Sequence, residues 1–82
     1  MKSEWTITYQ TSEIKVVNTW FNGEFLFVND ELQDRTFGLY QSALAGHLIN
    51  SKGEREMIKI RLGGAFKIKC YIFIDDKFIS MK

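Results

Sequence analysis

The sequence predicts an all-β fold, namely an antiparallel β-sandwich of about seven or eight strands, and three observations lead to this prediction. Ile, Val and Thr together outnumber Leu and Ala, and β-branched side chains fit a pleated sheet better than the crowded surface of a helix. Apolar and polar residues alternate in short segments, as in strands that bury one face. Turn-forming residues separate these segments at spacings that favour a sandwich or a barrel.

The first half of the chain divides into three strands and one ambiguous segment. Short polar or glycine-containing sequences mark the boundaries, because such residues tolerate the positive φ angles of tight turns. We expect strands at residues 5–10, 14–16 and 24–28, separated by turns at residues 11–13, 22–23 and 29–30. Residues 34–41 fit either an edge strand or a loop.

The second half divides into four strands. Alternation is most regular in the third of them, which reads Lys-Ile-Lys-Cys-Tyr-Ile-Phe-Ile. We expect these strands at residues 42–49, 55–62, 67–74 and 78–81, with turns at residues 51–53, 63–64 and 75–76.

The two halves resemble each other when the sequence is shifted by 46 residues without a gap. The shift aligns residues 14–16 with residues 60–62, and residues 25–32 with residues 71–78. We therefore expect a duplicated four-strand meander, whose two copies pack face to face because neither can bury its apolar face alone. The pseudo-repeats would cover about residues 4–34 and 42–81 of a single domain at residues 1–82.

Length and composition exclude several classes of protein. A chain of 82 residues favours one compact domain. No apolar segment approaches the roughly 18 residues that cross a bilayer as a helix, and the first residues lack the apolar region of a signal peptide, so we expect neither membrane insertion nor secretion. The single cysteine, Cys70, precludes an intrachain disulfide, and with only His47 beside it no His/Cys metal cluster can form. We expect a cytoplasmic protein without a cofactor.

Several short motifs occur in an order that is similar to a known family. They are Trp5-x-Ile7-x-Tyr9, Gly23-x-x-Leu26-x-Val28-Asn29-Asp30-Glu31, Leu44-x-Gly46, Ile58-x-Ile60 and Tyr71-x-Phe73-Ile74-Asp75-Asp76-Lys77. Over residues 5–79 they resemble the eight-stranded β-sandwich domain of the Fas apoptotic inhibitory molecule family, although that family typically has glycine where this chain has Asp30 and Asp76. The resemblance implies a non-catalytic domain that works through protein contacts, and it implies no catalytic or ligand-binding residues.

The residues that could support catalysis or hold a metal have simpler structural interpretations. His47 alternates with the apolar Leu48 and is expected to be a partly exposed strand residue. Cys70 is in phase with the expected core, where a thiol behaves as a small hydrophobe with a raised pKa. The pairs Asp30-Glu31 and Asp75-Asp76 could form an acid/base dyad or a cation site, but their positions between strands favour hairpin turns. We therefore predict no catalytic residues and no metal ligands.

Four aromatic residues repeat on the side of the hairpin strands opposite to the expected core. They are Phe25, Phe27, Tyr71 and Phe73. Four arrangements are open: the faces are assigned wrongly, residues 34–41 cover the rings, a second copy of the chain covers them, or they form an exposed patch for another partner or ligand. Because aromatic side chains are enriched at the centres of interfaces, we expect these residues to form a protein-binding surface.

Charge is unevenly distributed along the chain. Residues 1–41 carry three basic and six acidic side chains, a net charge of −3, whereas residues 42–82 carry eight basic and four acidic ones, a net charge of +4. Outward positions of two neighbouring strands hold a basic stripe, Arg55, Lys59, Arg61, Lys67 and Lys69. The stripe could bind an anion or nucleic acid, or it could be a solvated face that keeps sheets from aggregating. Glu56 on the inward side and a total charge of only +1 favour the solvated face.

We therefore predict a non-enzymatic module that binds a protein partner or a second copy of itself. Binding of an anion or nucleic acid through the basic stripe is the alternative, and nucleic acid is the less favoured partner. The predicted hydrophobic core consists of Trp5, Ile7, Tyr9, Ile14, Val16, Leu26, Val28, Leu44, Leu48, Ile58, Ile60, Ile68, Cys70, Ile72 and Ile74.

Overall fold

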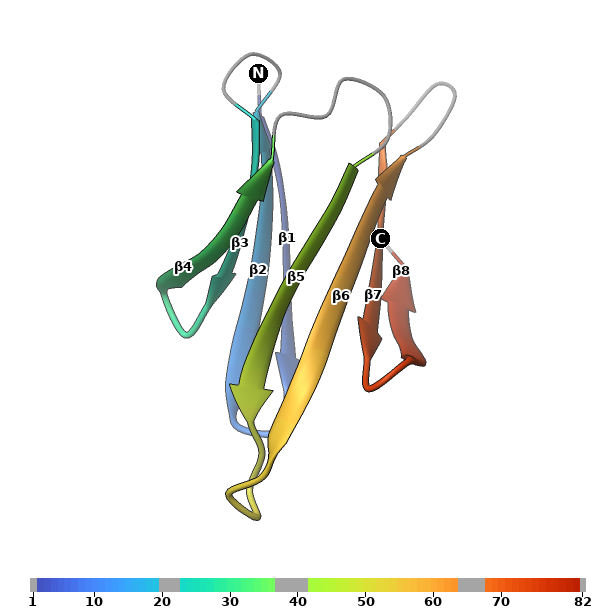
Figure 1. Ribbon diagram of the computed structural model, residues 1–82. Helices are drawn as coiled ribbons and strands as arrows, with labels where there is room; N and C mark the ends of the chain where they lie inside the picture. The colour runs from blue at the N-terminus through green and yellow to red at the C-terminus, as the bar shows by residue number, and fades with distance from the viewer. Residues whose placement is uncertain (1, 20–22, 37–41, 64–67, 82) are drawn as a thin grey trace.

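The computed structural model describes residues 2–19, 23–36, 42–63 and 68–81, and it confirms an all-β fold with two sheets. The regular structure of these residues is entirely extended, and the strands follow one another along the chain (Figure 1). The strands are β1 (Lys2–Tyr9), β2 (Ser12–Thr19), β3 (Gly23–Val28), β4 (Glu31–Thr36), β5 (Ser42–Ile49), β6 (Arg55–Gly63), β7 (Lys69–Ile74) and β8 (Lys77–Met81).

Each sheet is an antiparallel meander of four consecutive strands. Sheet A has the order β1-β2-β3-β4, and sheet B has the order β5-β6-β7-β8. Both sheets contribute side chains to one buried hydrophobic cluster, so their apolar faces pack together as in a β-sandwich. The edge strand β4 of sheet A lies beside the edge strand β5 of sheet B (Figure 1).

The first turn and the ambiguous segment differ in detail from the sequence predictions. The first turn comes one residue earlier than expected, because Gln10 adopts a positive φ of 54° and Ser12 already belongs to β2. The ambiguous segment is a strand in its described part, since β4 occupies Glu31–Thr36 directly after a two-residue turn. Residues 37–41, and the expected strand start at Lys67, lie outside the described residues.

The second hairpin turn of each sheet is built in the same way. Asn29 and the residue after it adopt φ angles of 51° and 67°, and Asp75 and its successor adopt 51° and 65°, as in a type I′ turn. The N–H of Asn29 donates to the carbonyl of Glu13, and Asn29 Oδ1 accepts from the Glu13 N–H, both at 2.9 Å. Asp75 makes the same two bonds with Met57. The expected turn at residues 75–76 is therefore confirmed, and its first carboxylate serves as a backbone acceptor.

The pairing registers show how the two sheets correspond. β3 corresponds to β7 and β4 to β8 at the shift of 46 residues, and a β-bulge interrupts both pairs at the same position. β2 and β6 correspond at a shift of 44 instead, because Val28 pairs with Ile14 whereas its equivalent Ile74 pairs with Ile58. The ungapped alignment of Ile14 with Ile60 was therefore wrong by two residues. A two-residue error leaves each side chain on the same face, so it did not alter the predicted core.

The predicted core is confirmed. Every core residue expected from the sequence is either buried or packed against the buried cluster, and Leu62 is an addition. The buried cluster consists of Ile14, Val16, Leu26, Val28, Leu44, Leu48, Ile58, Ile60, Leu62, Cys70, Ile72 and Ile74, and the partly buried Trp5, Ile7, Tyr9 and Ile68 pack against it.

A buried polar pair distinguishes sheet A from sheet B. Asn18 and Glu24 are each only 4% exposed, and Asn18 Nδ2 donates to Glu24 Oε2 at 2.7 Å. The equivalent cross-strand pair of sheet B is Leu62 with Cys70, and both of these side chains are buried. The two sheets thus share a backbone framework but place different chemistry at equivalent positions.

The bulge in β4 joins the edges of the two sheets. Gln33 is the extra residue of this bulge, and a bulge re-aims the side chains next to it. Asp34 Oδ2 accepts from the N–H of Ala45 at 2.8 Å, and Gln33 Oε1 accepts from the N–H of His47 at 2.7 Å. These N–H groups point away from β6, at the free side of β5. Two side chains of β4 therefore supply the hydrogen-bond partners that a neighbouring strand would otherwise supply.

Gly46→Ala is expected to reduce the free energy of unfolding by about 1–3 kcal/mol, because an added methyl group overfills a packed site. A Cβ at this position would lie 2.9 Å from Leu26 Cδ2 and would collide with Gln33 Oε1. Urea unfolding followed by circular dichroism measures the loss. Gly46→Ala should cost less in a Gln33→Ala background than in the wild type, and an equal cost in both backgrounds would contradict the collision with Gln33.

Candidate binding surface

The four aromatic residues expected to bind protein lie on two opposite faces of the molecule. Their strand neighbours point into the core, so Phe25 and Phe27 lie on the outer face of sheet A, and Tyr71 and Phe73 lie on the outer face of sheet B. All four side chains are partly buried. Because the two sheets and the core separate these faces, the four rings form two surfaces and not one patch.

The outer face of sheet A is partly covered by its own side chains. The Phe25 and Phe27 ring centroids lie 6.4 Å apart, and Lys15 Nζ lies 5.2 Å from the Phe27 centroid, within cation–π range. Val17, which pairs with Phe25 across the strands, is only 9% exposed although it lies on the outer face. This face therefore presents its aromatic rings already in contact with neighbours.

The outer face of sheet B carries the predicted basic stripe. Arg55, Lys59 and Arg61 are exposed and alternate along β6 with inward residues, and Lys69 is exposed at the start of β7. Lys67, the fifth predicted member, lies outside the described residues. Four of the five basic side chains are thus described on one face.

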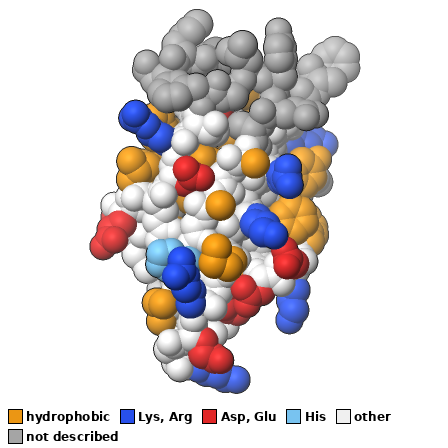
Figure 2. Space-filling view, in the orientation of Figure 1, with side chains coloured by type: hydrophobic (Ala, Val, Ile, Leu, Met, Phe, Trp, Pro, Cys, Tyr) orange, Lys and Arg blue, Asp and Glu red, His pale blue; other side chains and the backbone are white. Residues whose placement is uncertain are grey.

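Basic and aromatic side chains are interleaved on this face. The register places Arg61 opposite Tyr71 and Lys59 opposite Phe73, and cross-strand neighbours of this kind are within contact distance. Figure 2 shows Lys and Arg side chains among hydrophobic ones, close to the histidine. We call this surface the basic-aromatic face and define it by Arg55, Met57, Lys59, Arg61, Lys69, Tyr71, Phe73 and Phe78.

The basic-aromatic face differs from the outer face of sheet A in the partner of its equivalent lysine. Lys59 occupies the position equivalent to Lys15, but its Nζ forms an exposed ion pair with Asp76 Oδ1 at 2.8 Å. Such exposed pairs contribute little to stability. Phe73 stacks obliquely on Phe78, with centroids 5.5 Å apart, and Phe78 is 57% exposed. This face therefore combines charge with exposed apolar area.

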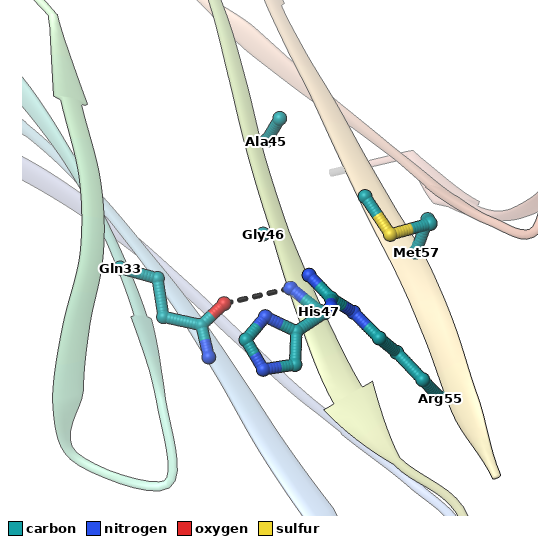
Figure 3. A pocket seen from close by; sticks show the side chains of 6 residues that line it. All are labelled: Gln33, Ala45, Gly46, His47, Arg55 and Met57. Carbon is teal, nitrogen blue, oxygen red and sulfur yellow. Dashed lines mark hydrogen bonds between the residues drawn. The ribbon is translucent and has the colours of Figure 1, made fainter.

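A shallow pocket adjoins the basic-aromatic face beside β4 (Figure 3). The Arg55 side chain extends from β6 toward His47 on β5, and Gln33 reaches the pocket from β4. Met57 forms an exposed apolar wall. The pocket has a volume of about 280 Å³, and the residues that line it are Gln33, Ala45, Gly46, His47, Arg55 and Met57.

The sequence analysis predicted neither the pocket nor the combination of basic and aromatic residues on the basic-aromatic face. The pocket combines Gln33, from the first half of the chain, with residues from the second half, and no sequence pattern brings them together. The sequence does contain a signal for the basic-aromatic face. Arg61 and Tyr71 lie in neighbouring strands, and each alternates with the core residues of its own strand. Combining the outward positions of both strands would have placed the basic and aromatic residues together.

The other candidate chemical groups contribute to the structure. His47 is a partly buried strand residue, as predicted, and Cys70 is fully buried in the core. Burial raises the pKa of the Cys70 thiol to about 12. Glu56 points inward, as predicted, and its Oε1 accepts from the Tyr9 hydroxyl at 3.4 Å. Partial burial, together with this carboxylate, raises the pKa of Tyr9.

Two further features are absent from the described part of the chain. Residues 2–19, 23–36, 42–63 and 68–81 contain no group of three or more His, Cys, Asp or Glu side chains placed to hold a metal ion. These same residues include no helix long and apolar enough to cross a membrane.

Comparison of the chain with protein-family models, with curated proteins and with solved structures finds no match. The resemblance to the Fas apoptotic inhibitory molecule family therefore stays a prediction from the sequence.

Cys70 is expected to resist alkylation in the folded protein. At pH 8, a thiol with a pKa of about 12 has a thiolate fraction of roughly 10⁻⁴, and the core also excludes the reagent. Iodoacetamide labelling, followed by mass spectrometry, should modify Cys70 in urea but not in native buffer. Labelling at comparable rates in both solutions would contradict its burial.

Proposed function

We propose that the chain is a non-catalytic module that binds another protein through the basic-aromatic face. The observation that carries this proposal is the placement of Tyr71, Phe73 and Phe78 on one outer face together with Arg55 and Arg61. Tyr, Phe, Met and Arg are the residue types that are enriched at protein interfaces, and Met57 belongs to the same surface. The family resemblance of the sequence supports a non-catalytic role as well.

The charge of this face favours a heterologous partner over a second copy of the chain. Arg55, Lys59, Arg61 and Lys69 are all exposed, and the one ion pair described among them is that of Lys59 with Asp76. A symmetric dimer would place the same face of both copies together and would bring like charges into contact. A partner with a negative surface would instead meet complementary charge.

The proposal predicts that a peptide ligand can be selected on this surface and lost by one substitution. Peptides enriched from a random display library on the wild-type protein should bind Phe73→Ser at least about tenfold more weakly, because aromatic anchors contribute most of the binding free energy. The matched control is Phe27→Ser, which removes the equivalent ring from sheet A. It should change the affinity less than about twofold.

Fluorescence anisotropy measures these affinities, and circular dichroism verifies that both variants fold. Enriched peptides that tolerate Phe73→Ser, or that are equally sensitive to Phe27→Ser, would contradict the assignment of the basic-aromatic face.

The proposal also predicts a monomer in solution. Size-exclusion chromatography with light scattering should give a mass near 9.6 kDa over a wide range of concentration, because like charges oppose self-association through this face. A dimer that dissociates in Phe73→Ser would instead show that the face binds a second copy.

A further inference from the structure

We propose that the partner contributes an extended acidic segment, and that one of its carboxylates enters the pocket between Arg55 and His47; this inference rests on the proposed function. The pocket has the size of a side chain, since its volume of about 280 Å³ is at the lower limit of sites that hold a whole small ligand. It opens on the same side as the basic-aromatic face, because Arg55 and Met57 belong to both.

The lining of the pocket fits a carboxylate. Arg55 supplies a guanidinium fork, which binds carboxylates in a bidentate manner. Gln33 Oε1 is occupied by the N–H of His47, so the donating Nε2 end of the same amide is left for a ligand. None of the described side chains that line the pocket is acidic, and Met57 can contact the methylene groups of a glutamate. The neighbouring Asp34 already accepts from the N–H of Ala45. The described lining therefore offers donors and an apolar wall, and it carries no negative charge of its own.

The spacing of the outward side chains of β6 determines which residues of a bound peptide should be acidic and which apolar. Outward side chains of a strand recur about every 6.8 Å, and an extended peptide lying along β6 has the same repeat. Arg55, Met57, Lys59 and Arg61 then face alternate positions of the peptide. The complementary segment carries an acidic residue, an apolar residue and two further acidic residues, each separated by one residue.

The aromatic geometry favours a peptide over a single-stranded nucleic acid. Bases stack on open aromatic faces, whereas the Phe73 ring is inclined by 57° against Phe78 and is only partly exposed. Met57 interrupts the basic stripe between Arg55 and Lys59, and the chain carries a net charge of only +1. Both features suit a ligand of mixed apolar and acidic character better than a polyanion.

The test uses a fluorescein-labelled peptide of serines with Glu, Leu, Glu and Glu at alternate positions. Its affinity, measured by anisotropy, should fall as salt is raised, and a peptide with Gln in place of each Glu should bind at least about tenfold more weakly. Arg55→Gln should weaken binding of the Glu peptide at least about tenfold. The charge-matched control Lys52→Gln, in the exposed turn before β6, should weaken it less than about twofold.

Three results would overturn the inference. They are absence of binding of the Glu peptide up to about 1 mM at low salt, equal effects of Arg55→Gln and Lys52→Gln, and tighter binding of labelled oligothymidine than of the peptide. If library-selected peptides still lose affinity in Phe73→Ser, such a result rejects only the proposal that an acidic segment occupies the pocket. If that dependence is lost too, the proposed function fails with it.

Discussion

Two hydrogen bonds from the β4 bulge to β5 join the two sheets at one edge. A bulge directs Gln33 and Asp34 toward the edge of the other sheet, where their oxygens satisfy the N–H groups of His47 and Ala45. Unpaired edge strands favour aggregation, and here side chains cover one of them. The same contact leaves no space for a side chain at Gly46 and holds the Gln33 amide at the pocket. Edge protection and pocket geometry therefore have a common origin.

The framework is repeated, but its chemistry is not. At the bulge of β8, the equivalent of Gln33 is Ile79, which is 37% exposed and cannot accept hydrogen bonds. On the outer faces, Val17 of sheet A corresponds to Arg61 of sheet B. These differences leave the core intact, because outward and edge positions vary without changing which residues point inward. They leave the outer face of sheet B with four exposed basic side chains and with the exposed ring of Phe78.

Much of the fold could be predicted from sequence because its signals are local. Alternation identified the core side of every strand that carries buried residues, and the amide or carboxylate of Asn29 and Asp75 marked the turns. The segment that forms the end of β4 was ambiguous in the sequence. Gln33 and Asp34 are polar there because they accept hydrogen bonds from the backbone of β5. Polar residues in that position do not show the alternation that identifies a strand.

The candidate site was less predictable because it depends on long-range placement. Residue types alone identified both the aromatic and the basic residues, but the four aromatic residues were predicted as one surface, whereas Phe25 and Tyr71 lie on opposite faces. That separation follows from the packing of two similar sheets through their apolar sides. The pocket required the contact between β4 and β5, which joins two halves of the chain and has no local pattern.

In the function that we propose, the outer face of sheet B binds an acidic partner and the equivalent face of sheet A does not. Two-dimensional ¹H–¹⁵N correlation spectra of the labelled protein, recorded during titration with the unlabelled Glu-containing peptide, test it residue by residue. Saturable shifts are expected for the amides around His47, Arg55 and Phe73, with little change around Lys15 and Phe27. Shifts centred on Lys15 and Phe27, or no saturable shifts at all, would contradict it.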